Sequence, residues 1–555
     1  MRRSYVATGV IPFTAEVRCR DGRSSVKSVV LVVFLAGIAG LSLDAQAPRL
    51  AANPTFAKDV APILHAKCIN CHRPGEVAPM SLRTFDEVRP WARAIKQKVT
   101  ARQMPPWFAD APAGEFANDA RLTPQQIDTI ARWVDGGAVR GNAADEPKPP
   151  ALTEGWQLGE PDYIITLPLV NIPAEGRDYF PTPNLTLDLP EDRWIRAIEI
   201  RPSNREVTHH SVIFTTPAGG GAGLGAATNS GFFDVLGVWA VGTPATVYPE
   251  GMGRWLRKGQ MLRTNLHYHP NGKPQTDQTR VGLYWGKGEL KKEVASALAG
   301  DLTFRIPPGA KNHEMRAVYV VDQDSVIVSY FPHMHLRGKD MLITATFPDG
   351  RKQTLINVPA YDFNWQLFYY PRQQITLPRG TRVDIVAHYD NSADNPNNPD
   401  PTRTVTFGEQ STDEMMFGMF EFVAKEGVSP VPVTLDTRMD ALQSTLPADS
   451  TYRIQVSILK PIPSVLHLPR SGEGTWYLGQ SRLQINMIPI KNIVWNGDQF
   501  SFRMDARFGT GAGWTFDVTG SVSADGTIRG QTAPVGVEKA PFSRTFEGRS
   551  SRGTR

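Results

Sequence analysis

The sequence is poor in cysteine, with only three in 555 residues, which excludes a fold held together by several disulfide bonds. Cys19 lies in a segment that we expect to be removed, so Cys68 and Cys71 are the only pair left. Structural zinc is disfavoured as well, because it needs about four cysteine or histidine ligands and no second cysteine pair exists. The remaining pair therefore needs another explanation.

Basic runs interleaved with aromatic residues are also missing, so nucleic acid is not expected as a partner. The apolar run at residues 28–43 is too short for a comfortable membrane span. Basic residues precede it, and Ala45-Gln46-Ala47 follows it, as at the cleavage site of a secretory signal. We interpret residues 1–47 as a signal peptide, which predicts a periplasmic or secreted protein without a stable membrane span. The alternative is an uncleaved signal that anchors the chain.

The pair that remains belongs to the motif Cys-Ile-Asn-Cys-His at residues 68–72. C-x-x-C-H is the attachment signature of a c-type haem. Cys68 and Cys71 would add to the haem vinyl groups, and His72 would supply the proximal nitrogen to iron. A thioredoxin-like redox pair would need a βαβ context, which the surrounding sequence lacks. The motif therefore predicts one covalent haem c.

Helical patterns flank this motif. Residues 56–72 have apolar spacing suited to a helix, and residues 122–137 form a clear helix with Thr123 as N-cap, Pro124 at the first turn and Gln126 completing a capping box. This arrangement resembles a small class I cytochrome c. The resemblance implies that the methionine of "ARQMPPW", Met104, is the distal haem ligand, with Met80 as the alternative.

Beyond residue 158 the sequence changes to short alternating apolar segments separated by Gly, Pro, Asn and Asp, which is typical of all-β sandwiches. Histidines occur there in pairs. In a strand, residues i and i+2 share a face, so His333 and His335 can reach one metal together, and His267 and His269 have the same geometry. His209 and His210 are adjacent, so joint ligation needs a bulge or the use of different ring nitrogens.

The order "THHSVIF", "LHYH", "HMHLRGK" and "TDEMMFGMF" resembles the copper type II, ascorbate-dependent monooxygenases, the family of peptidylglycine α-hydroxylating and dopamine β-monooxygenases. The resemblance covers roughly residues 160–425. It implies two β-sandwich domains with one copper each. One copper would be held by His209, His210 and His267, and the oxygen-binding copper by His333, His335 and Met415. His269 is then a spare residue near the site, and Met416 and Met419 are core.

Two positions depart from the peptide-hydroxylating members of that family. Phe331 stands where they have an arginine two residues before H-x-H, and Met419 stands where they have a tyrosine four residues after the copper methionine. Both anchors for a substrate carboxylate are missing. An apolar or aromatic small molecule is therefore a better substrate prediction than a C-terminal glycine peptide.

The overall prediction is a multidomain chain with a small all-α cytochrome c domain, two all-β, jelly-roll-like copper sandwiches and a C-terminal antiparallel β domain. The function expected from the resemblance is an exported monooxygenase that hydroxylates a C–H bond of a small organic substrate with O2, with electrons from ascorbate or a redox protein through the fused cytochrome. A non-catalytic electron-transfer or copper-binding protein is the alternative. No role is predicted for His388.

The expected domains are a signal at 1–47, a haem domain at 48–140, a linker at 141–158, sandwiches at 159–298 and 299–425, a linker at 426–444 and a β barrel or sandwich at 445–555.

Overall fold

The computed structural model describes residues 53–550 apart from short internal gaps. The segment predicted to be a signal peptide, residues 1–47, lies outside the described residues. None of the helices in the described ranges combines the length and the apolar character that a membrane span requires. The gaps are residues 151–154, 217–233, 432–433, 459, 480–484, 508–512, 538–541 and 543.

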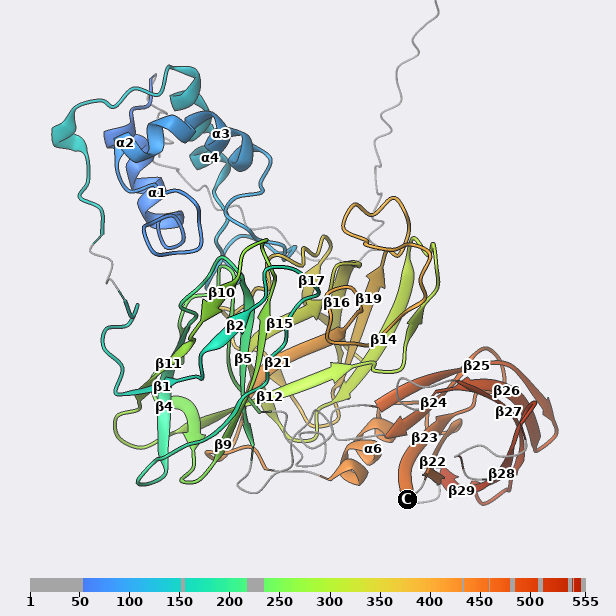
Figure 1. Cartoon of the computed structure of the whole chain (residues 1–555). Coiled ribbons are helices and arrows are strands. Elements are labelled where there is room, and N and C mark those ends of the chain that lie inside the picture. The colour runs from blue at the N-terminus through green and yellow to red at the C-terminus, as the bar shows by residue number, and fades with distance from the viewer. Residues whose placement is uncertain are drawn as a thin grey trace, which may run out of the picture. The chain divides into compact units, whose positions relative to one another are not determined.

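The described chain begins with short helices that share one apolar core, which includes Phe56, Leu64, Ile95 and Trp133. The helices α1 to α4 are labelled in Figure 1. Their bounds are η1 (Phe56–Val60), α1 (Ala61–Lys67), α2 (Phe85–Val88), η2 (Arg89–Trp91), α3 (Ala92–Thr100), α4 (Pro124–Asp135) and η3 (Ala143–Asp145).

Helix α4 begins as the sequence predicts. The Thr123 hydroxyl accepts a hydrogen bond from the backbone N–H of Gln126 (3.1 Å), and the Gln126 side chain accepts one from the Thr123 N–H (2.9 Å). This reciprocal capping box satisfies two donors that the first helical turn leaves unpaired. Ile130 and Trp133 bury the inner face of the helix against the shared core.

The next part of the chain, strands β1 to β11, forms two facing sheets with an apolar core between them, except that β2 and β10 pair with each other in a separate two-stranded sheet. One sheet has the order β3-β9-β5-β6, and the other contains β1-β11-β4-β8. The strands are β1 (Tyr163–Thr166), β2 (Val170–Ile172), β3 (Asn184–Thr186), β4 (Arg193–Arg201), β5 (Thr208–Thr216), β6 (Asp234–Ala240), β7 (Thr246–Val247), β8 (Met252–Leu256), β9 (Met261–Tyr268), β10 (Gln275–Asp277) and β11 (Arg280–Trp285). We call this the first β region.

The second β region, strands β12 to β21, repeats the two-layer arrangement. The four-stranded sheet β14-β19-β16-β17 faces a sheet that contains β12-β21-β15-β18. The strands are β12 (Lys292–Gly300), β13 (Arg305–Ile306), β14 (His313–Val320), β15 (Ser325–Met334), β16 (Gly338–Thr346), β17 (Lys352–Val358), β18 (Thr376–Leu377), β19 (Arg382–Tyr389), β20 (Val405–Thr406) and β21 (Met416–Ala424).

The two β regions share one continuous nine-stranded sheet, because β12 pairs in parallel with β8. The domain boundary expected after residue 298 falls inside β12. A buried ion pair between Arg254 of β8 and Glu421 of β21 (2.8 Å) spans the junction, and Ser329 of β15 donates a hydrogen bond to the same carboxylate. The predicted all-β character of this part of the chain is confirmed.

The C-terminal strands close into an eight-stranded antiparallel barrel (Figure 1). Its predicted hairpins are present at Asn496-Gly497 and Asp525-Gly526, where both glycines have positive φ, a conformation that glycine adopts at little steric cost. Helix α6 (Leu435–Ser444), within the segment expected to be a linker, packs on the barrel through Met439 and Leu442. The strands are β22 (Thr451–Ile458), β23 (Lys460–His467), β24 (Gly474–Gly479), β25 (Ile485–Asn496), β26 (Gln499–Ala506), β27 (Trp514–Val522), β28 (Thr527–Pro534) and β29 (Thr545–Ser550).

Candidate metal centres

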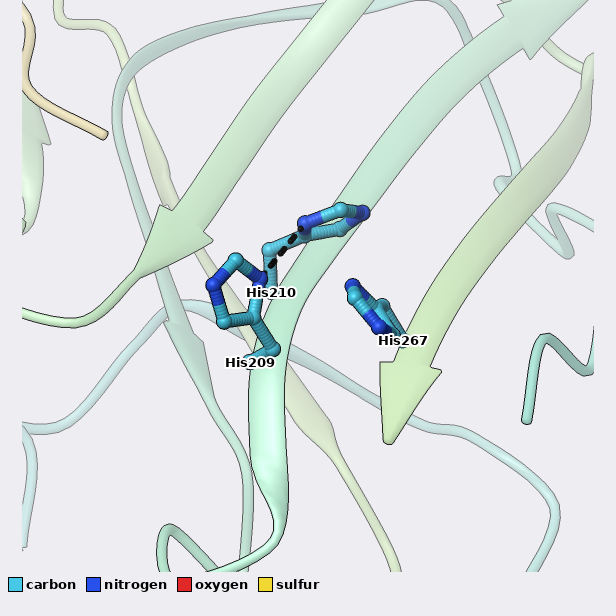
Figure 2. Close-up of side chains that lie close together, drawn as sticks. All are labelled: His209, His210 and His267. Atoms are coloured by element: carbon cyan, nitrogen blue, oxygen red, sulfur yellow. Dashed lines mark hydrogen bonds between the residues drawn. The ribbon is translucent and has the colours of Figure 1, made fainter. Parts of the chain in front are cut away.

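A first group of three histidines is brought together by the neighbouring strands β5 and β9. His209 and His210 lie on β5, and His267 lies on β9 directly opposite His210. The register between these strands shifts between Thr208 and His210, which is the bulge that two adjacent histidines need in order to serve one site. Figure 2 shows the three imidazole rings gathered at this place. The structure therefore supports grouping these three residues.

The geometry of this group suits a metal ion. One ligand atom from each ring lies within 4.8 Å of the others. The Nδ1 atoms of His209 and His210 are 3.3 Å apart, and both ring centroids lie less than 5 Å from that of His267, at 4.7 and 4.8 Å. Three imidazole nitrogens at such spacing are a donor set suited to copper, zinc, iron or nickel.

Burial keeps these rings neutral and leaves some of their nitrogens unpaired. Burial lowers the pKa of His209 to about 3 and moves the pKa of His210 and His267 below the ordinary value. His209 Nε2 and His267 Nδ1 are buried and have no hydrogen-bond partner in the part of the chain that the structure describes. An unpaired buried nitrogen costs about 1–3 kcal/mol, and a coordinated metal ion would relieve that cost. The residues present thus fit a metal ion.

Asp178 orients the imidazole of His267 through a contact at Nε2. Its Oδ2 atom lies 3.1 Å from His267 Nε2, and its Oδ1 atom lies 2.8 Å from Nδ1 of His269, whose side chain is 76% exposed. Burial alone would raise the pKa of Asp178, but hydrogen bonds from His267 and Ser411 outweigh burial and hold it well below the usual range. His267 is therefore anchored through Nε2, which leaves Nδ1 for a metal. His269 contacts the anchoring carboxylate and lies outside the group.

We expect Asp178→Ala to lower copper affinity at the first histidine group about 10–100-fold, because a metal-bound histidine that loses its carboxylate partner loses orientation and basicity. The measurement is competition for copper with a chromogenic chelator on the full-length protein. Asp192→Ala is the matched control, since Asp192 pairs with Arg257 on the surface. Equal affinities of the two variants would show that Asp178 has no part in holding the metal.

A second group consists of His333, His335 and Met415. β15 and β21 are antiparallel, with His333 opposite Phe417 and Met334 opposite Met416. The ladder ends at this pair, and the backbone N–H groups of His335 and Met415, the next residue on each side, both donate to Oε2 of Glu414. The two imidazole centroids are 5.3 Å apart. The chain thus brings the backbone of Met415 close to that of His335.

The second pair of imidazoles is also buried and neutral. Burial lowers the pKa of His333 to about 4 and moves that of His335 well below its ordinary value. His333 Nδ1 bonds to Oε1 of the buried Gln366 (3.1 Å). His335 Nδ1 is buried with no partner among the described residues. Two imidazole nitrogens are donors suited to copper, zinc, iron or nickel, so these residues fit a metal ion.

Glu414 binds the backbone at both His335 and Met415, which come from the two segments of the second group. Its carboxylate accepts hydrogen bonds from the backbone N–H groups of His335 (2.8 Å), Met415 (3.3 Å) and Arg337 (2.6 Å). Tyr389 donates its hydroxyl to the Met415 carbonyl (2.8 Å). Burial raises the pKa of Glu414 to about 8. One buried side chain therefore connects the strand that carries the histidines with the segment that carries the methionine.

Above pH 8, where Glu414 is ionised, Glu414→Gln is expected to destabilise the fold by about 1–3 kcal/mol, because an amide has one acceptor oxygen and leaves at least one of the three backbone N–H groups unpaired. We also expect weaker copper binding at the second group, since His335 and Met415 lose a common anchor. Denaturant unfolding of the metal-free chain and chelator competition measure the two effects. The exposed Glu426→Gln is the control, and an unchanged midpoint of unfolding for Glu414→Gln would contradict the prediction.

The C-x-x-C-H residues follow helix α1 in a tight turn, in which the His72 N–H donates to the Cys68 carbonyl (3.0 Å). Both thiols are free, and burial raises the pKa of Cys68 to about 12 and raises that of Cys71. His72 Nδ1 lies 3.3 Å from the Met80 carbonyl oxygen, and burial lowers the pKa of the ring. A neutral His72 that donates from Nδ1 keeps its Nε2 lone pair for a metal, so these residues fit a haem iron.

The two candidate distal methionines occupy different places. Met80 packs against the helical core, and its backbone carbonyl lies at Nδ1 of His72, on the side of the ring away from Nε2. Met104 lies in the loop after α3 and is partly buried. Met80 is thus tied through its backbone to His72, and Met104 lies on a separate loop.

The remaining residues considered from the sequence lie elsewhere. Met416 and Met419 are buried among apolar side chains, as expected. His388 lies on β19 and contacts Asp340 (2.7 Å) and Glu314 (3.5 Å). The sequence offered no signal for Asp178 or Gln366, which come from segments distant from the histidines; Glu414 could have been noticed, since it adjoins Met415.

No family model and no curated protein matches this chain.

Proposed function

We propose that this protein is an exported monooxygenase that contains one haem c and two copper ions and hydroxylates a C–H bond of a small organic substrate with O2. The observation that carries the proposal is the pair of buried imidazole groups, to the second of which Met415 is tied by the Glu414 carboxylate that its backbone shares with His335. Copper bound at the second group would supply the site at which O2 is reduced.

The chain's own residues would prepare that chemistry in three ways. His333, His335 and Met415 would bind the metal and hold it in a buried place with little access to water. Gln366 and Glu414 would orient these ligands by hydrogen bonds. Phe331 and Phe417, whose rings stack beside His333 with centroids 6.2 Å away, give the site an apolar border that favours an apolar or aromatic substrate.

For the helical part of the chain we propose a small all-α cytochrome c domain. Cys68 and Cys71 would attach the haem, and His72 and Met104 would be its axial ligands. A contact of Arg205 with the segment just after the C-x-x-C-H motif supports delivery of electrons from the haem to the first histidine group. Arg205 donates to the Gly75 carbonyl (2.8 Å) and pairs with Glu76, shortly after the haem motif.

This contact lies close in sequence to both centres. Glu76 is four residues after His72, and Arg205 is four residues before His209. The side chains of the pair are about nine-tenths buried, with 10% and 12% exposed. A reductant such as ascorbate or a redox protein would then act on the haem.

The test is metal and haem analysis of full-length protein matured in a periplasm, followed by O2 uptake with ascorbate. The proposal expects two coppers and one haem per chain, and O2 uptake that needs both coppers. One haem with both coppers but no O2 uptake under any reductant would favour a non-catalytic electron-transfer protein. Absence of stoichiometric copper would contradict the proposal.

A further inference from the structure

A segment between α3 and α4 leaves the helical core and packs on the second β region. We call this segment, residues 107–119, the arm. Ala109 and Phe116 are buried in the apolar core of the second β region, whereas Leu122, just beyond the arm, is buried again in the helical core. The helical part of the chain is therefore attached to the second β region through the arm.

The partner of the arm is the long loop between β17 and β18, residues 359–375, which we call the β17–β18 loop. The backbone N–H of Ala117 donates to the Tyr370 carbonyl (2.8 Å). The Asn118 side chain donates to the Phe368 carbonyl (2.7 Å) and accepts a hydrogen bond from the Tyr370 N–H (3.1 Å). The arm therefore pairs with the loop as a short antiparallel edge strand would.

Aromatic side chains fill the contact between the arm and the loop. The ring of Tyr369, from the loop, meets the rings of Trp107 and Phe116 with centroids 5.0 and 5.7 Å apart. Both contacts are edge-on, an arrangement that aromatic pairs favour. Since Phe116 is also almost fully buried, it is the main apolar anchor of the arm.

The same loop pairs with β15 along its other edge. The Tyr369 N–H donates to the Tyr330 carbonyl, and the Tyr330 N–H donates to the Tyr369 carbonyl, both at 2.9 Å. Backbone groups of an extended segment point alternately to its two edges, so Tyr369 faces β15 while Phe368 and Tyr370 face the arm. The loop is thus a middle strand between β15 and the arm.

Two side chains of the loop reach the part of β15 that carries the histidines. The Tyr361 hydroxyl bonds to the N–H (3.1 Å) and the carbonyl (2.8 Å) of Met334, which lies between His333 and His335. Gln366 places its Oε1 atom 3.1 Å from Nδ1 of His333. Gln366 is buried, and its Nε2 has no hydrogen-bond partner within the described ranges. The position of its amide therefore depends on the backbone of the loop.

We propose that the arm, acting through the β17–β18 loop and Gln366, positions the imidazole of His333, so that Phe116 and Asn118 are positioning residues of the second group. A bond from Nδ1 to Gln366 leaves Nε2 of His333 for a metal. The inference rests on the proposed function, since it takes the second group as a metal site. It adds that this site depends on a segment of the proposed haem domain, 250 residues before the loop.

The first test is copper binding to full-length variants in which one group is disabled. In His210→Ala, copper is left to the second group, and adding Phe116→Ala is expected to lower its affinity about 10-fold, the lower end of the range for residues that orient a metal ligand. In His333→Ala, copper is left to the first group, and adding Phe116→Ala should leave its affinity unchanged. Competition with a chromogenic chelator measures both affinities. Equal losses in the two backgrounds would show a general loss of structure and overturn the inference.

Phe347→Ala is the matched control for the loss of a buried phenylalanine. Phe347 belongs to the same apolar core as Phe116 but lies in the turn after β16. In the His210→Ala background it should leave copper affinity unchanged. A loss of affinity as large as that of Phe116→Ala would contradict a specific role of the arm.

Asn118→Ala is a milder variant, because Asn118 is exposed and the aromatic anchor stays in place. We expect an affinity loss at the second group of about 3-fold, within the range that a lost hydrogen bond explains. Asn118→Asp keeps an acceptor for the Tyr370 N–H and should restore part of the affinity. Wild-type affinity in both Asn118→Ala and Phe116→Ala would overturn the inference.

Hydrogen exchange of the copper-free chain tests the link between arm and loop without a metal. Phe116→Ala should speed amide exchange at residues 366–370 at least about 10-fold, since exchange follows local opening. Phe347→Ala should leave it unchanged. Unchanged exchange in Phe116→Ala would overturn the inference whether or not copper binds. Absence of copper from His210→Ala, with faster exchange in Phe116→Ala, would overturn the proposed metal site and leave the link between arm and loop standing.

Discussion

Met415→Leu is expected to lower O2 uptake with ascorbate at least about 100-fold, more than the 10–100-fold typical of residues that only orient a metal ligand. Leucine keeps the volume and apolar character of methionine but has no sulfur to coordinate copper. The second copper should bind more weakly, while the first histidine group should keep its metal. Copper stoichiometry, copper affinity and the initial rate of O2 uptake measure the effect.

The matched control for this prediction is Met341→Leu. Met341 is fully buried in the core of the second β region, so the same substitution tests the general cost of exchanging a buried methionine there. We expect a stability change below about 1.5 kcal/mol and normal O2 uptake. Wild-type copper content and O2 uptake in Met415→Leu would show that Met415 is not a ligand.

Met104→Leu is expected to lower the reduction potential of the haem by roughly 0.2 V, within the span of about 0.8 V over which axial ligands set haem potentials. Loss of a soft distal sulfur removes its preference for ferrous iron. The ferric absorption band that arises from sulfur–iron bonding should disappear as well. Redox titration of the full-length protein and its visible spectrum measure these two effects.

Met80→Leu provides the control with the same chemistry. Met80 packs on the helical core while its backbone carbonyl contacts His72, so the substitution changes packing and leaves that contact in place. Its haem potential and its sulfur–iron band should stay as in the wild type. The reverse result, in which Met80→Leu loses the band and Met104→Leu keeps it, would assign the distal position to Met80.

The helices around the C-x-x-C-H motif, and the barrel hairpins, could be predicted from the sequence because their signals are local. Thr123 and Gln126 cap α4 through atoms only three residues apart, and glycine at 497 and 526 allows the turns that need positive φ. Alternation also predicted that His333 and His335 share a face. The same rule implied that His209 and His210 could share a site only with a bulge or with different ring nitrogens, and β5 has a register shift at this position.

Other features depend on residues far apart in the chain. The domain boundary was expected after residue 298, but local sequence patterns cannot reveal that β12 pairs with both β8 and β21. Asp178 precedes His267 by 89 residues, and Glu414 reaches back 79 residues to the His335 N–H. Sequence spacing carries no information about such contacts, because they form only when separate strands pack.

The sequence by itself determined which reactive groups this protein carries: a C-x-x-C-H motif, imidazoles in strand-compatible pairs and a methionine beside Glu414, since these are set by residue type and short spacing. Tertiary structure alone decided how these groups are assembled. The pairing of β5 with β9 brings His267 to His210, and burial makes the rings neutral and leaves nitrogens unpaired. The physical reason is that desolvation and contact between distant strands arise only when the strands pack together.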